Sequence, residues 1–258
     1  MREFVVAGNW KMNPTALADA TALALAVREA ADLLPGVTAV VCPPTVWLLD
    51  VQRAAGGGRL RIGAQTMHWE PSGAYTGETS PTMLAGVAEF VIVGHSERRQ
   101  YDGETDEGVG RKVAAAVAHG LRPIAAVGER AEERRAGETE AVVERQVRAA
   151  LAGLERIAGT GLVIAYEPVW AIGTGDAATG EDAQAVAGRI RSILRELDPD
   201  GADEIPIQYG GSCTPDNAPE FFAQPDIDGA LVGGSSLRAE SFAGILRAAA
   251  DARATAGG

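Results

Sequence analysis

The chain has 258 residues, of which 46% are hydrophobic and 22% are charged. This composition excludes a disordered chain, a collagen-like fibre and a scaffold held together by disulfides. Lys and Arg number 23 against 35 Asp and Glu, so the formal net charge is −12. Such acidity argues against nucleic acid as a partner, because a protein that binds nucleic acid needs a basic patch on its surface. It still allows a small phosphorylated ligand, because an anion site needs only a few amides and one or two cations.

The sequence carries no signal for a membrane or for an oxidising compartment. No stretch approaches the roughly 18 apolar residues of a membrane span. The start, MREFVVAGNWK, has no basic flank before a long apolar region and no cleavage signal. Cys42 and Cys213 lie far apart and are interpreted as unpaired thiols. We therefore expect a cytoplasmic protein with no membrane partner.

Short apolar or β-branched runs recur along the whole chain. Most are continuous rather than alternating, which is typical of parallel strands covered on both faces. They predict strands at Phe4–Ala7, Val37–Cys42, Leu60–Ala64, Phe90–Val93, Pro123–Val127, Leu162–Tyr166, Ile205–Tyr209 and Ile227–Val232. Between them, apolar residues at helical spacing predict helices that include Thr15–Leu34, Thr139–Leu154 and Asp182–Leu197.

These eight strand–helix units average about 32 residues, the size of a βα unit. No linker rich in Pro or Ser interrupts them, so we expect residues 1–258 to form a single domain. Eight units favour an α/β fold of the closed (β/α)8 TIM-barrel type. Periodicity alone leaves an open, doubly wound sheet as the alternative.

Two connections exceed the usual strand-to-helix length of about 2–6 residues. They are Thr66–Thr79 and Pro168–Thr179. Long loops in a compact domain tend to be lids or binding loops, and the loops after the strands form the active face of a barrel. We expect both loops to contribute to function.

Polar residues follow several predicted strands, so a barrel would bring them to one face. Asn9 and Lys11 follow the first strand, His95 and Glu97 the fourth, and Glu167 the sixth. A carboxylate at the mouth of an apolar strand, such as Glu167, suits a general base. A salt-bridged carboxylate is the alternative interpretation.

His95 lies in the segment GHSERR, where Ser96 is the expected N-cap of the following turn. A helix N-terminus disfavours imidazolium, so a neutral imidazole there can donate a hydrogen bond to a carbonyl oxygen. A purely structural histidine is the alternative. His68 and His119 are interpreted as structural, and the three histidines form no metal-ligand cluster.

Two matched glycine pairs, in YGGS (209–212) and VGGSS (232–236), end the seventh and eighth strands. Each leads toward a helical stretch, so backbone amides and a helix N-terminus can face an anion. Barrels often bind phosphate at these two loops. Tight strand-to-helix turns are the alternative. The charged run ERAEERR (129–135) is interpreted as a solvated face, with Glu129 at the end of the fifth strand.

Six motifs in order along the chain resemble those of the triosephosphate isomerase family. They are AGNWKMN (7–13), GAYTGE (73–78), VGHSERR (93–99), AYEPVWAIGTG (165–175), YGGS (209–212) and DGALVGG (228–234). The resemblance covers nearly the whole chain, and EPVWAIGTG is its most specific part. It implies an enzyme of glycolysis and gluconeogenesis that interconverts dihydroxyacetone phosphate and D-glyceraldehyde 3-phosphate through an enediolate. It implies neither a metal nor an organic cofactor.

The resemblance also implies a role for each matching residue. Glu167 would be the base, His95 the neutral electrophile and Lys11 the source of positive charge, with Asn9 beside it and Glu97 in support. The phosphate would be held by amides around Gly173, Ser212, Gly233 and Gly234. Loop Pro168–Thr179 would close over the site. Loop Thr66–Thr79 would enter the neighbouring subunit of a homodimer with its tip near Thr76.

The chain departs from the family pattern at several positions. Ala126 stands where Cys is usual, Ser235 where Ala is usual and Cys213 where Val is common. The segment Met67-His68-Trp69 resembles a branch of the superfamily that isomerises four-carbon ketose phosphates, so a tetrulose phosphate is an alternative substrate. A non-catalytic phosphate-binding barrel is a further alternative, which the intact catalytic residues disfavour.

Overall fold

The computed structural model describes residues 2–171 and 178–256. Its eight parallel strands pair in chain order, and β8 pairs back with β1 to close a barrel. The strands are β1 (Phe4–Asn9), β2 (Val37–Cys42), β3 (Arg61–Ala64), β4 (Phe90–Val93), β5 (Arg122–Val127), β6 (Val163–Tyr166), β7 (Ile207–Tyr209) and β8 (Gly229–Val232). The closed barrel is confirmed, and the open sheet is wrong.

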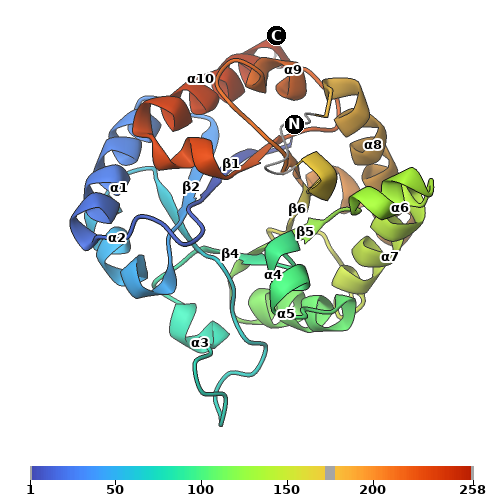
Figure 1. Cartoon of the computed structure of the whole chain (residues 1–258), viewed down its shortest axis with the longest axis horizontal. Coiled ribbons are helices and arrows are strands. Elements are labelled where there is room, and N and C mark those ends of the chain that lie inside the picture. The colour runs from blue at the N-terminus through green and yellow to red at the C-terminus, as the bar shows by residue number, and fades with distance from the viewer. Residues whose placement is uncertain (1, 172–177, 257–258) are drawn as a thin grey trace.

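Helices surround the barrel, as Figure 1 shows. They are α1 (Leu17–Asp32), α2 (Leu48–Ala55), α3 (Pro81–Leu84), α4 (Ser96–Tyr101), α5 (Asp106–Ala118), α6 (Ala131–Arg135), α7 (Thr139–Leu151), α8 (Gly180–Leu197), α9 (Ala218–Phe222) and α10 (Ala239–Ala256). Short 3-10 turns are η1 (Thr45–Trp47), η2 (Val169–Ala171), η3 (Ala202–Glu204) and η4 (Gly234–Leu237). Within the described ranges, no helix is both long and apolar enough to cross a bilayer.

Apolar strand residues alternate between two cores, although the runs look continuous in sequence. Val5 and Ala7 of β1 belong to a cluster inside the barrel, together with Phe90 of β4. Phe4 and Val6 instead join the larger cluster between the strands and the helices. Both faces of each strand are therefore covered, which explains the lack of a visible period of two.

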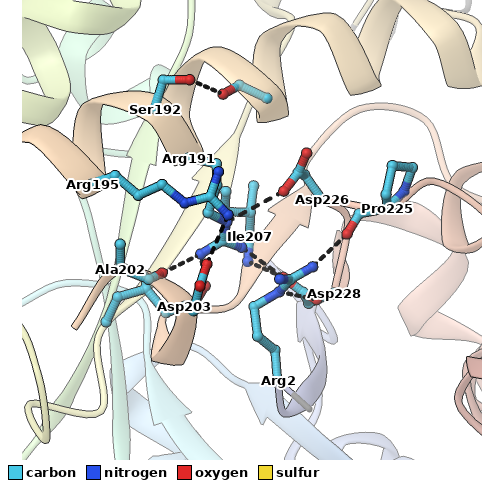
Figure 2. A network of polar contacts seen from close by, with 12 residues as sticks. Arg2, Arg191, Ser192, Arg195, Ala202, Asp203, Ile207, Pro225, Asp226 and Asp228 are labelled. Atoms are coloured by element: carbon cyan, nitrogen blue, oxygen red, sulfur yellow. Dashed lines mark hydrogen bonds and ion pairs between the residues drawn. The ribbon is translucent and has the colours of Figure 1, made fainter. Parts of the chain in front are cut away.

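The end of the barrel opposite the carboxyl ends of the strands is fixed by a buried ionic network (Figure 2). Arg191 of α8 is 1% exposed, and its Nη2 lies 3.1 Å from Asp228 Oδ2, just before β8. Its Nη1 donates to the carbonyl oxygen of Ile205 at 2.7 Å. Arg2 Nε lies 2.8 Å from Asp228 Oδ1. The network ties the N-terminus, α8 and the entries to β7 and β8 together, far from the opposite mouth.

Candidate active site

The carboxyl ends of the strands surround a cleft of about 300 Å3. Asn9 is the last residue of β1 and Leu231 lies in β8, while the other contributing residues lie in the connections after β1, β4, β6, β7 and β8. The lining residues are Asn9, Lys11, His95, Glu167, Gly210, Gly211, Ser212, Cys213, Leu231, Gly233, Gly234 and Ser235. The structure thus brings together most of the residues singled out in the sequence. Glu97 is not among the lining residues, but its carboxylate contacts Lys11.

His95 and Glu167 are in direct contact at the centre of the cleft. His95 Nε2 lies 2.9 Å from Glu167 Oε1, and both side chains are buried. Glu167 Oε2 also accepts the Ser96 N–H at 2.8 Å. The carboxylate is therefore held on both oxygens by groups at the start of α4.

The imidazole of His95 itself caps α4. Its Nδ1 accepts the Glu97 N–H at 3.2 Å. The expectation that Ser96 is the N-cap is therefore wrong: Ser96 is the first residue of α4, and its N–H is used by Glu167. Because Nδ1 accepts a hydrogen bond, the proton of a neutral imidazole must lie on Nε2, facing the cleft.

The contact between these two side chains shifts both pKa values. Burial raises the pKa of Glu167, but the charge of His95, its hydrogen bond and the Ser96 N–H together hold it below the usual range. Burial lowers the pKa of His95, and the Glu167 carboxylate outweighs this and raises it. Glu167 is thus ionised at neutral pH, as a base must be. The neutral imidazole expected from the sequence requires that this carboxylate turn toward a substrate.

Lys11 reaches the cleft from an unusual backbone conformation, with φ at 52°. Its N–H donates to Asn9 Oδ1 at 3.0 Å. Its Nζ lies 2.6 Å from Glu97 Oε1, and both side chains are partly exposed. An ion pair this accessible adds little to the stability of the fold. The contact with Glu97 instead fixes the position of the Lys11 ammonium group beside the cleft.

Two glycine loops form the side of the cleft opposite α4. A Cβ on Gly233 would lie 3.7 Å from Lys11 Cε, and a Cβ on Gly234 would meet nothing within 4 Å. The space beside these amides is therefore open to a ligand. Ser235 Oγ donates to the Cys213 carbonyl at 2.8 Å and links the two loops. Gly173, expected to add a further amide, lies outside the described residues.

The expected helix behind each glycine pair is only partly present. After Ser212 the chain continues to Ala218 before α9 begins, so no helix N-terminus follows the first pair directly. The second pair leads straight into the 3-10 turn η4, which begins at Gly234. The backbone amides of the loops, rather than a long helix, are the donors available here.

The ends of loop Pro168–Thr179 are anchored to a cluster that the sequence did not reveal. Trp170 Nε1 donates to Glu129 Oε1 at 2.9 Å, and Glu129 is fully buried. The Arg134 guanidinium carbon lies 4.1 Å from the centre of the Trp170 ring, and Arg134 Nη2 lies 3.1 Å from Asp182 Oδ1. Asp182 in turn forms a capping box with Thr179 at the start of α8.

Glu129 is therefore no part of a solvated face, and that expectation is wrong for it. It also follows β5 rather than ending it, because β5 stops at Val127. Residues 129–135 carry charges of both signs, which is typical of an exposed segment, so the sequence did not indicate that Glu129 is buried. The only available signal was its position at the end of a buried strand.

A larger cavity of about 440 Å3 lies on the other side of Glu167. Its cationic side chains are already paired: Arg99 and Arg145 both contact Asp106, and Arg130 contacts Glu133. These pairs resemble the pair of Lys11 with Glu97 in the cleft, but the lining of this cavity lacks the two glycine loops. In the described part of the chain, no three His, Cys, Asp or Glu side chains gather in a way that would hold a metal ion.

The long loop Thr66–Thr79 projects from the barrel in Figure 1. The His68 ring stacks on Trp69, with centroids 4.4 Å apart, and also lies 4.1 Å from the Tyr75 ring. Trp69 packs beneath the Arg111 guanidinium of α5. The unusual segment at 67–69 thus shapes this loop and does not line the cleft. Both cysteines are buried and unpaired, as expected.

Comparison with known proteins gives one family. The family model described as "Triosephosphate isomerase" matches residues 4–249. The triosephosphate isomerase of Dehalococcoides mccartyi is 48% identical over 254 residues, which cover 98% of this chain and 100% of that protein. The triosephosphate isomerase of Carboxydothermus hydrogenoformans is 51% identical over 252 residues, covering 96% and 99% respectively.

Proposed function

The chain belongs to the triosephosphate isomerase family, and from this premise we infer that it interconverts dihydroxyacetone phosphate and D-glyceraldehyde 3-phosphate. It is an intramolecular isomerase whose reaction belongs to glycolysis and gluconeogenesis. The contact that carries the assignment of its catalytic side chains is the one between His95 Nε2 and Glu167 Oε1, at 2.9 Å, in a cleft that also holds Lys11.

Glu167 acts as the base. It takes a proton from C1 of dihydroxyacetone phosphate, which leaves an enediolate. The hydroxyl proton on O1 then passes to O2, and Glu167 returns its proton to C2, which gives D-glyceraldehyde 3-phosphate. Its pKa lies below the usual range in the free enzyme, so the carboxylate is ready to accept a proton at neutral pH. When it turns toward the substrate, it leaves the imidazole and no longer raises the pKa of His95.

His95 then faces the two substrate oxygens with its Nε2–H. The Glu97 N–H on Nδ1 fixes this tautomer. Lys11 supplies the positive charge that stabilises the enediolate oxygen and attracts the anionic substrate. Asn9 fixes the backbone of Lys11, and Glu97 holds its ammonium group. No step in this scheme needs a metal or an organic cofactor.

The phosphate group lies between the two glycine loops and Lys11. Its donors are the amides of Ser212, Gly233 and Gly234, with Gly173 added from loop Pro168–Thr179. This loop closes over the site and excludes water, which protects the intermediate and strengthens the electrostatic interactions within the cleft. Near the start of this loop, the hydrogen bond from Trp170 to the buried Glu129 provides one anchor.

The protein acts in the cytoplasm as a homodimer joined through loop 66–79. Exposed apolar side chains in the connections after β1, β2 and β3 support this proposal: Met12 is 89% exposed, Val46 69% and Met83 64%. These three connections are neighbours in the barrel. Together with Tyr75 in the loop, they offer an apolar surface that a second copy would cover.

A four-carbon substrate is not proposed. The segment 67–69 that suggested it lies in the projecting loop, and the relatives matched over their full length carry the three-carbon name. The non-catalytic alternative finds no support either, since His95, Glu167 and Lys11 meet in one cleft.

The decisive experiment measures isomerisation of D-glyceraldehyde 3-phosphate by the purified protein, with Glu167→Gln as its control. Loss of the general base should lower kcat by about a thousandfold. Solvent deuterium should enter the C1 position of dihydroxyacetone phosphate only with the unaltered protein. Equal rates for the two proteins would refute the role given to Glu167, and no turnover by the unaltered protein would refute the function.

A further inference from the structure

Within the described ranges, Lys11 is the one residue other than glycine that has a positive φ. An L-residue rarely adopts this conformation, so surrounding groups must hold it there. Asn9 Oδ1 accepts the Lys11 N–H and fixes one side of the residue. A different side chain, with no part in the scheme above, fixes the other side.

That side chain is Gln65, which directly follows β3. Its Nε2 donates to the Lys11 carbonyl oxygen at 2.7 Å and to the Cys42 carbonyl oxygen at 2.9 Å. Both partners are acceptors, so only the NH2 end of the amide can face them. Cys42 ends β2, and its carbonyl also accepts the N–H of the fully buried Trp10 at 3.1 Å. One amide therefore ties the backbone of Lys11 to the rigid end of the barrel.

We propose that Gln65 is a positioning residue, which keeps Lys11 in its left-handed conformation and thereby holds the ammonium group over the cleft. The inference deepens the proposed function and rests on it for the role of Lys11. A rotation about φ of Lys11 would redirect the whole side chain away from Glu97 and from the open space beside Gly233. Gln65 does not line the cleft itself, so it acts on the substrate only through Lys11.

Two substitutions separate the hydrogen bonds from the bulk of the side chain. Gln65→Met keeps the length and removes both donors, while Gln65→Glu keeps the shape and turns a carboxylate oxygen toward two carbonyl oxygens. Gln224→Met is the matched control, because Gln224 Nε2 donates to the Glu220 carbonyl at 3.2 Å on α9, outside the cleft. The readouts are kcat, KM, Tm and the Kd for glycerol 3-phosphate, a phosphate monoester that does not react.

We expect both Gln65 variants to raise KM and the Kd for glycerol 3-phosphate by about tenfold, as misplacement of one charged group would. Because Lys11 also stabilises the enediolate, kcat should fall as well. Gln224→Met should leave kcat, KM and Kd unchanged. A lower Tm with unchanged KM and Kd would show a purely structural role and overturn the proposal.

The same titration in a Lys11→Ala background makes the test specific. If Gln65 acts through Lys11, adding Gln65→Met or Gln65→Glu to Lys11→Ala leaves the Kd for glycerol 3-phosphate where Lys11→Ala alone puts it. A further additive loss overturns the proposal. Because Kd requires no turnover, an unaltered protein that binds this ligand without isomerising its substrate refutes the proposed function alone. An unaltered protein that does not bind it refutes both.

Discussion

At the scale of single residues, two opposing effects act on the pKa of the Glu167 carboxylate. Burial alone would raise the pKa of Glu167 and make it a neutral acid. The imidazole of His95 and the Ser96 N–H reverse this, so the carboxylate stays ionised. The same contact raises the pKa of His95. The two groups therefore titrate as a pair, and a change in one must be visible in the other.

This coupling predicts the pH dependence of a His95→Gln variant. Glutamine can still donate a hydrogen bond to Glu167, but it brings no positive charge. The effect of burial is then less opposed, so the pKa of the Glu167 carboxyl rises. The acid limb of kcat/KM, where the base becomes protonated, should move upward by about one pH unit. An acid limb that stays in place would show that the imidazole does not control the ionisation of Glu167. The control is Arg195→Met, far from the cleft.

The glycines of the phosphate loops allow a second prediction at this scale. A Cβ on Gly234, the first residue of η4, would meet nothing within 4 Å. Gly234→Ala should therefore fold normally while its methyl group occupies the space left for the ligand. We expect KM to rise by about tenfold or more with little change in Tm. Gly128→Ala is the contrasting variant. Its Cβ would lie 1.7 Å from the Glu167 carbonyl oxygen and must displace the backbone just after β6, so Tm should fall.

At the scale of elements, predictions from the sequence succeed where burial dictates the pattern. β2 and β4 have the predicted bounds, because runs such as FVIV must be covered on both faces. β7 begins at Ile207 rather than Ile205, since Pro206 between them has no N–H to donate to a neighbouring strand. The apolar character of a run predicts that it is buried, but pairing with a neighbouring strand also requires backbone N–H donors.

The candidate site is predictable only in part, for a related reason. Position at the end of a strand or directly after it is enough to place Asn9, His95 and Glu167 around one mouth. Contacts between distant segments are not visible in the sequence. Glu129 is buried because Trp170 and Arg134 cover it from two other elements, and Gln65 matters because Lys11 has an unusual φ.

The ionic network at the opposite end of the barrel gives a prediction for stability alone. Asp228→Asn removes the buried carboxylate beside Arg191 Nη2 and leaves the partly exposed Asp226, 3.4 Å from Arg191 Nε, as its ionic partner. The free energy of unfolding should therefore fall by about 3 kcal/mol. Arg195→Met is the matched control, because Arg195 and Asp203 form an ion pair in which both side chains are more than half exposed. Its effect should stay below about 0.5 kcal/mol. Chemical denaturation measures both, and kcat should not change in either variant.

At the scale of the whole molecule, the net charge of the chain opposes the binding of an anionic substrate. The chain carries −12 overall, which favours solubility and repels anions at a distance. The cleft must therefore attract its phosphorylated substrate at short range, through Lys11 and the loop amides. Screening by salt weakens the long-range repulsion more than the short-range attraction. Moderate salt should therefore reduce substrate affinity less here than in an enzyme whose overall charge attracts its substrate at long range.

The last prediction concerns the surface that would join two copies. Met83 of α3, just after the projecting loop, is 64% exposed, and Val46, in the neighbouring connection after β2, is 69% exposed. Introducing charge with Met83→Glu and Val46→Asp would place carboxylates in an apolar interface, where an unpaired charge is costly to bury. If this surface joins two copies, sedimentation should show dimers of the unaltered chain and monomers of the doubly substituted variant. Leu33→Glu is the control: Leu33 is 80% exposed at the C-terminal end of α1, away from these connections, and should leave the dimer intact. A dimer that survives the first two substitutions, or is lost with the third, would place the interface elsewhere on the barrel.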